Sequence, residues 1–361
     1  MIALPLDADL RLPKYRRETW QRFYTFHLNY GSHPGGVYYV LPHLAAMYGW
    51  DAEQRAWAAF LNGNTQNPVT TLLLMRAGNR PALAEKVLSY WRQHYTKLQW
   101  DTDRRYHKAR FADAVGSYLA LTGTSQVDYW RRAAAGGWAG CWEAANAIAT
   151  MGRLSSWSYL EYLRILGLDI PPADTLYLRD MSGSRSHRNG LTLLAGLDDL
   201  MWWKENPTFT GHYPDGVLPY LEQLGEDLLA EAYLRNPRHP DVGYLTIESA
   251  LCTWKSWHKP NRRYAGVYND MLHTRLTSAE ITHGHRFGAI WDARAVALPD
   301  WLRLETNPAD PGCVPEKQNQ YLNTGRPVTL GRVWPEMWSA FDSNVDSGKY
   351  VNDNTHPYRE P

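Results

Sequence analysis

Residues 178–190 concentrate side chains that bind phosphate. They read LRDMSGSRSHRNG and include three arginines, one acid, one histidine and three serines around a glycine. Arginine forks, serine hydroxyls and free N–H groups at a helix start all suit an oxyanion, whereas the plain alternative is a solvated basic loop. The predicted ligands of a phosphate-like group are Arg179, Ser184, Arg185, Arg188 and Asn189.

A second segment, residues 254–264, alternates aromatic rings with cations. It reads WKSWHKPNRRY and contains no acid. In nucleic-acid-binding proteins, rings stack on bases while cations meet phosphates. The helix dipole alone favours cations at a helix end, but four cations and two tryptophans exceed what it requires. The predicted contacts are Trp254, Lys255, Trp257, His258, Lys259, Arg262, Arg263 and Tyr264.

The residues upstream of Trp254 have helical spacing. Ile247, Ala250, Leu251 and Trp254 form a buried stripe, and Glu248 lies on another face together with Lys255. A carboxylate or a histidine can accept a proton, and a cation can stabilise the charge of a leaving group. The predicted catalytic residues are Asp180, His187 and Glu248 for the first role and Lys255 for the second.

Two further stretches are rich in side-chain amides, which donate and accept hydrogen bonds and so suit the edge of a base. In residues 61–68 the candidates are Asn64, Gln66 and Asn67, with helix capping and turn formation as the alternative. In residues 315–326 the candidates are Lys317 and Asn319, with an exposed connector as the alternative.

Several motifs are absent from the sequence. It has no phosphate loop, no dinucleotide fingerprint, no nucleophile elbow and no His-Glu-x-x-His. His283 and His285 lack a visible third ligand, and three scattered cysteines make neither a disulfide framework nor a thiolate zinc site. No metal site is predicted.

The composition is that of a globular protein. Among 361 residues, 44% are hydrophobic, 21% are charged and the net charge is +1. This balance argues against non-specific polyanion binding by the whole surface. Neither a transmembrane run nor a signal peptide is visible. We therefore expect a cytoplasmic protein that is basic only where a substrate binds.

Helical patterns dominate, and strand-like alternation is scarce. Asp51 with Gln54 predicts a capping box, Asn67 with Pro68 a helix start, and Gly78 a stop. A further helix is predicted to begin near residue 189. The predicted fold is all-α and multi-helical, with lobes at 1–170 and 171–341 and a polar tail at 342–361.

Uncommon strings in these segments resemble the bacteriophage amino acid:DNA transferases, also named α-glutamyl/putrescinyl thymine pyrophosphorylases. The strings are HPGGVYY at 33–39, FLNGNTQNP at 60–68, SGSRSHRNG at 182–190, ESALCTWKSWH at 248–258 and NRRY at 261–264. The resemblance implies a helical fold distantly related to helix-hairpin-helix DNA glycosylases.

The resemblance also implies a reaction. In thymidine hypermodification, a kinase converts 5-hydroxymethyluracil in DNA to the 5-pyrophosphoryloxymethyl form, and an amino acid or amine then displaces pyrophosphate. This implies DNA with modified thymine and a donor as partners, action downstream of that kinase in the host cytoplasm, and base flipping. No cofactor is assigned, and a divalent cation accompanying the pyrophosphate is left open. The donor's carboxylate would suit Arg185 or Arg188.

Three alternatives remain at the level of sequence. The first is a helical glycosylase-like enzyme acting on a modified base, the second is a non-catalytic nucleic-acid-binding protein, and the third is an unrelated helical enzyme for a small phosphorylated substrate. Abasic sites formed without a donor would indicate the first, and salt-sensitive DNA binding without chemistry the second.

Overall fold

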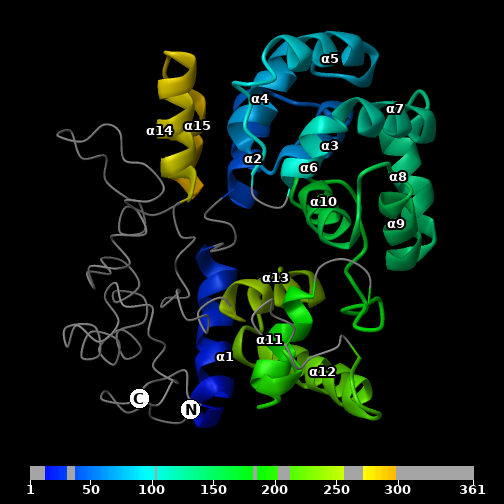
Figure 1. Cartoon of the computed structure of the whole chain (residues 1–361), viewed down its shortest axis with the longest axis vertical. Helices are drawn as coiled ribbons and strands as arrows, with labels where there is room; N and C mark the ends of the chain where they lie inside the picture. The colour runs from blue at the N-terminus through cyan, green and yellow to red at the C-terminus, as the bar shows by residue number, and fades with distance from the viewer. Residues whose placement is uncertain are drawn as a thin grey trace, which may run out of the picture. The chain divides into compact units, whose positions relative to one another are not determined.

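The computed structural model describes residues 13–30, 37–101, 104–181, 185–201, 212–255 and 271–297. These residues form fifteen α-helices and no strand (Figure 1). The predicted all-α fold is therefore confirmed. No described helix is long and apolar enough to cross a membrane.

The chain divides into two compact units. Unit 1 comprises Met1–Gly35, Asp174–Asp270 and Pro299–Pro361, and unit 2 comprises Gly36–Ala173 and Met271–Leu298. The chain therefore leaves each unit and returns to it. The limits of two consecutive lobes stay a prediction.

Unit 1 is built from four α-helices and one short 3-10 helix among its described residues. They are α1 (Pro13–Tyr30), α11 (Ser186–Leu194), η3 (Asp198–Leu200), α12 (Val217–Arg235) and α13 (Tyr244–Trp254).

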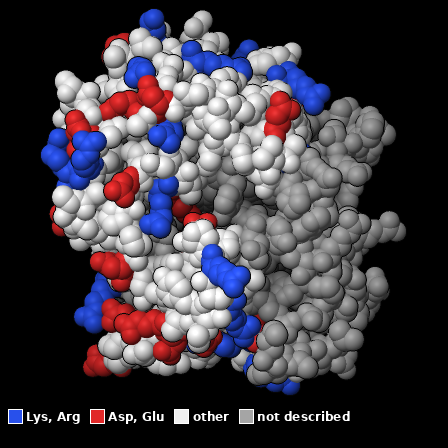
Figure 2. Space-filling model, turned by 180° about the vertical axis from the view of Figure 1, so that it is seen from behind, with Lys and Arg blue, Asp and Glu red and all other residues white. Residues whose placement is uncertain are grey.

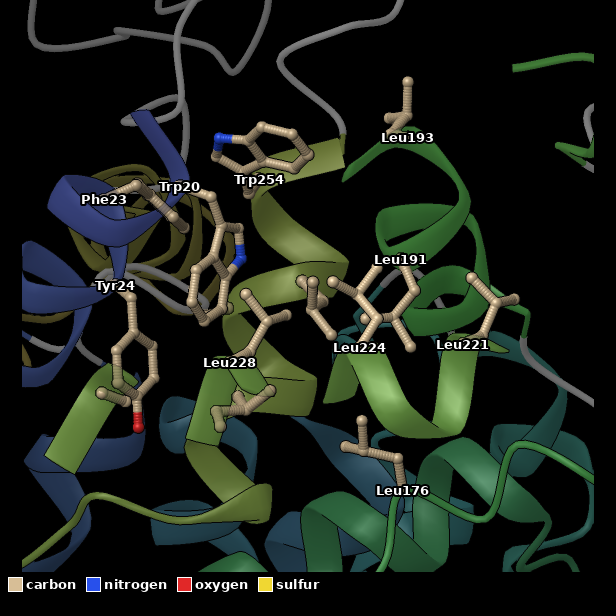
Figure 3. Packing of buried hydrophobic residues seen from close by; sticks show 14 of the residues in the cluster. Trp20, Phe23, Tyr24, Leu176, Leu191, Leu193, Leu221, Leu224, Leu228 and Trp254 are labelled. Atoms are coloured by element: carbon tan, nitrogen blue, oxygen red, sulfur yellow. The ribbon is translucent and has the colours of Figure 1, made fainter. Parts of the chain in front are cut away.

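A hydrophobic core joins these helices. Figure 3 shows Trp20 and Tyr24 of α1 with Trp254 of α13 and with leucines from α11 and α12. Trp20 and Trp254 are fully buried, as expected for rings that lie on helical stripes. Burial of such large side chains stabilises the unit through the hydrophobic effect.

Ion pairs fix α1 at the edge of this core. Arg16 pairs with Asp198 at 2.5 Å while its own side chain is only 3% exposed. Arg235 of α12 pairs with Glu18 at 2.8 Å. These ion pairs therefore connect α1 to residues about 180 to 220 positions later in the chain.

Unit 2 contains the remaining helices. They are α2 (Val37–Met47), α3 (Ala52–Thr65), α4 (Pro68–Ala77), η1 (Pro81–Leu83), α5 (Ala84–Gln93), α6 (Arg105–Ala109), α7 (Phe111–Thr122), α8 (Gln126–Ala135), α9 (Gly137–Asn146), α10 (Arg153–Ile165), α14 (Met271–His283) and α15 (Gly288–Ala297).

Local signals set several of these helix ends. Asp51 and Gln54 form the predicted capping box of α3, and Asn67 caps α4, which ends at Gly78 as predicted. Within the unit α3 packs against α10, and Phe60 stacks on Tyr118 with ring centroids 4.0 Å apart. From Ala56 to Thr65 every residue of α3 is buried, so this helix lies inside the core of the unit.

The described surface carries both signs of charge. Figure 2 shows lysine and arginine interspersed with aspartate and glutamate over the face in view. This distribution agrees with the net charge of +1. Strong local binding of an anion must therefore come from particular side chains rather than from a general positive field.

Candidate active site

Close packing of α11 against α13 creates the candidate site in unit 1. A Cβ atom added at Gly190 would lie 2.9 Å from both the Cβ and the carbonyl oxygen of Leu251. Only glycine therefore permits the observed approach. The helix begins at Ser186, three residues before the predicted start, because packing against α13 stabilises a turn that has little helical propensity of its own.

The first pair at this contact joins His187 to Glu248. The Nδ1 atom of His187 lies 3.5 Å from Oε1 of Glu248, and the two side chains are 0% and 3% exposed. A carboxylate beside one ring nitrogen orients an imidazole and stabilises its protonated form. Two of the four predicted catalytic residues are thus brought together in the interior.

The second pair joins Lys255 to Ser186. Nζ of Lys255 donates to Oγ of Ser186 at 2.8 Å, and Lys255 is buried. Ser186 is the first residue of α11, where backbone N–H groups are not used by the helix. A cation, a hydroxyl and a helix N-terminus therefore lie together, and this combination suits an oxyanion. Ser186 and His187 are consecutive residues of α11, so both pairs join this helix to the segment 248–255.

Arg188 holds the preceding backbone. Its guanidinium is fully buried, and Nη1 donates to the carbonyl oxygens of Leu178 at 3.2 Å and of Asp180. Burial raises the pKa of the nearby Tyr213 hydroxyl, and the charges of Arg188 and Arg185 oppose that rise. Arg188 thus orders the 178–180 segment from within.

The other described residues of the 178–190 segment lie in three kinds of surroundings. Arg179 is exposed and forms a two-pronged ion pair with Glu222 at 2.8 and 2.9 Å, which lowers the pKa of that carboxyl. Asp180 and Arg185 are half-buried, and Asn189 is buried. A substrate phosphate would have to compete with Glu222 for Arg179. Arg185 directly precedes Ser186 at the start of α11 and is therefore the better placed of the two arginines for an anion at that helix end.

Trp254 belongs to the hydrophobic core. Its ring is fully buried among the residues of unit 1 (Figure 3), as the predicted stripe with Ile247, Ala250 and Leu251 requires. That position favours packing over stacking on a base.

The amide-rich candidates lie in unit 2. The Oδ1 atom of Asn67 accepts from the N–H of Thr70 and so caps α4. Asn64 is buried and donates to the carbonyl of Phe60 at 3.0 Å. Gln66 ends α3 in the left-handed conformation with φ 48°. Asn67 therefore fulfils the capping alternative, and Asn64 is held inside the unit.

Nine of the predicted site residues lie outside the described residues. They are Ser184, Trp257, His258, Lys259, Arg262, Arg263, Tyr264, Lys317 and Asn319. Among the residues that the structure does describe, no group of three or more His, Cys, Asp or Glu side chains is placed to hold a metal ion.

Ser186 is absent from the ligands predicted from the sequence. Of the three serines in this segment, the sequence analysis selected Ser184 instead. The distinguishing feature is Lys255, which lies 69 residues further along the chain. Within the local sequence, only a correct prediction that the helix begins at Ser186 could have identified this serine as a ligand.

The described residues thus place a buried histidine–carboxylate pair and a lysine–serine pair at the start of a helix, within an all-helical fold. The family model of the amino acid:DNA transferases matches residues 37–263, and the chain belongs to that family. It is therefore a transferase that acts on DNA with an amino acid. The match covers α3, α11 and α13, and so includes every residue of the two pairs.

One curated relative is named Serinyltransferase and comes from Salmonella phage ViI. It is 27% identical over 303 residues, which cover 77% of this chain and 72% of the relative. No solved structure gives a significant match.

Proposed function

We propose that this transferase joins an amino acid to modified thymine in DNA by displacing pyrophosphate from a 5-pyrophosphoryloxymethyl group. The observation that carries the proposal is that the His187–Glu248 and Ser186–Lys255 pairs both join the start of α11 to the segment 248–255. One pair supplies a group for the proton that is lost, and the other supplies a site for the charge that leaves.

The leaving group determines what the second pair must do. The bond between the methylene carbon and the pyrophosphate oxygen breaks, and its electrons remain on that oxygen. Lys255, Ser186 and the free N–H groups of α11 stabilise the negative charge that develops there. Arg185, at the start of the same helix, adds a second cation to this end of the site.

The incoming nucleophile determines what the first pair must do. An amine or hydroxyl of the donor forms the new bond to the methylene carbon and loses one proton. His187 accepts that proton, and the Glu248 carboxylate stabilises the resulting imidazolium. The base leaves the duplex stack before reaction, because His187 and Lys255 are buried and its methylene carbon must be brought to them.

We place the reaction downstream of a kinase that pyrophosphorylates 5-hydroxymethyluracil in DNA, in the cytoplasm of an infected host. A divalent cation bound to the pyrophosphate would add to the charge supplied by Lys255. Assays in a chelator and in magnesium separate the two contributions.

The test uses DNA that carries the pyrophosphorylated base, the full-length protein and a panel of amino acids and amines. Digestion and mass spectrometry should reveal a new nucleoside, with one pyrophosphate released for each one formed. DNA with unphosphorylated hydroxymethyluracil is the control. Failure of every donor would refute the proposal, and abasic sites without a donor would indicate a glycosylase instead.

A further inference from the structure

A strip of the surface of unit 2 combines aromatic rings with cations. It is assembled from residues at or near the ends of α2, α4, α5 and α14, which are far apart in the sequence. All of its members are exposed or half-buried, and they are Tyr48, Arg76, Tyr90, His94, Lys97, His283 and His285. We call this set the basic strip.

Contacts join the first four members of the basic strip. Nη2 of Arg76 donates to the hydroxyl oxygen of Tyr48 at 3.3 Å. Arg76 is also close enough to Tyr90 for its charge to oppose the rise that burial causes in the pKa of that hydroxyl. The ring of Tyr90 in turn lies 4.3 Å from the ring of His94, measured between centroids. Rings and a cation therefore follow one another along the surface.

His283 connects the end of α14 to the turn that follows α5. Its ring is hydrogen-bonded to the backbone of Lys97. Burial lowers the pKa of His283, and the positive charges of His285, Lys97 and His94 lower it further. The ring centroids of His283 and His285 are 6.1 Å apart. Basic side chains from two distant segments therefore lie within electrostatic range of one another.

Two further contacts hold α14 against the same turn. Arg275 of α14 is paired with Asp101 at 2.5 Å. Nε2 of Gln99 donates to Oγ of Ser278 at 3.1 Å. The meeting of the two segments is therefore fixed by packing and ion pairing inside unit 2.

The basic strip is not neutralised by acids. No aspartate or glutamate occurs in residues 90–100 or 281–291, although the whole chain has 37 acids against 38 lysines and arginines. Among the residues that the structure describes, no carboxylate forms an ion pair with Arg76 or Lys97, whereas the exposed Arg80 has an aspartate partner. The strip thus keeps a local positive charge on a protein whose net charge is only +1.

We propose that the basic strip binds the sugar–phosphate backbone of the DNA substrate. Arg76 and Lys97 meet phosphate oxygens, and the hydroxyls of Tyr48 and Tyr90 are donors of the kind that contact phosphates in protein–DNA complexes. Such contacts carry no sequence information, so the strip supplies affinity for DNA rather than choice of a base. The inference rests on the proposed function only for DNA as the substrate.

The test measures binding of a short unmodified duplex to the full-length protein by fluorescence anisotropy at several salt concentrations. Each phosphate contact contributes about 0.9 to the slope of log K against log salt concentration, so the loss of two contacts should make the slope shallower by about 1.8. We expect this change, together with weaker binding, when Arg76→Gln and Lys97→Gln are combined. Both side chains are exposed, and the variant should unfold at the wild-type denaturant concentration.

The matched control combines Arg92→Gln with Arg132→Gln and removes the same net charge. Arg92 is exposed on α5, but it lies two positions from both Tyr90 and His94 and so on another face of the helix. Arg132 is exposed on α8, which contributes nothing to the basic strip. The control should keep the wild-type affinity and slope.

Three outcomes would overturn the inference. They are an unchanged slope in the variant of Arg76 and Lys97, an equal change of slope in the control, and no binding of DNA by the wild type. Because the duplex carries no modified base, binding is measured independently of pyrophosphate displacement. A protein that binds through the strip but forms no new nucleoside would refute the proposed reaction and leave this inference intact.

Discussion

Gly190→Ala tests whether the contact between α11 and α13 holds the candidate site together. The added Cβ would lie 2.9 Å from the Leu251 carbonyl oxygen and 3.2 Å from its carbonyl carbon, whereas carbon atoms pack best at about 3.5–4.0 Å. Because the obstruction is backbone, rotation of a side chain cannot relieve it. The helices must separate.

The size of the effect follows from two opposing terms. Overpacking a close contact costs about 1–3 kcal/mol, and backbone atoms place this site near the upper end. Replacing glycine by alanine inside a helix returns about 0.8–1 kcal/mol. The expected net loss of unfolding free energy is therefore about 2 kcal/mol, measured by denaturant titration with an unchanged m-value.

Gly225→Ala is the matched control in the same unit. Gly225 is also buried in the middle of a helix, but its added Cβ would meet only the flexible end of Leu176 at 3.1 Å. That variant should be neutral or more stable by up to about 1 kcal/mol. Equal stability of the two variants would refute the argument, as would Gly190→Ala with wild-type transfer activity.

Three further predictions concern charge. Lys255→Gln should lower the rate of transfer by about 10²–10³, as expected when a group that stabilises developing charge is lost; an unchanged rate would remove Lys255 from the site. Glu248→Gln should lower it by about 10²–10⁴ and shift the pH–rate profile, because His187 loses the carboxylate that stabilises its protonated form; a lower rate with an unshifted profile would indicate a structural role only. Burial lowers the pKa values of His27 and His107 to about 3, so the unfolded chain binds more protons below the usual histidine pKa of about 6.5. The free energy of unfolding should therefore be highest above pH 6.5 and should fall between pH 6.5 and pH 3, by up to about 1.4 kcal/mol per pH unit for each histidine. Replacing His107 with glutamine should make this fall less steep when it is measured by denaturant titration at several pH values. An unaltered dependence on pH would contradict the prediction.

The sequence by itself determined the local structure. The capping box at Asp51 and the cap at Asn67 form as predicted, since these hydrogen bonds join residues only three positions apart. The stripe that ends at Trp254 is buried as its spacing requires. Such signals act within one or two helical turns and are readable without knowledge of the rest of the chain.

Only the tertiary structure decided which charged groups meet. Arg179 is bound by Glu222 and Arg188 by the backbone of its own segment, although the sequence presents both as equal candidates for an anion. The helix pairing that places Lys255 beside Ser186 depends on a glycine that admits Leu251. The free energy of a charge depends on its burial and on partners distant in sequence, and these are properties of helix packing rather than of residue spacing.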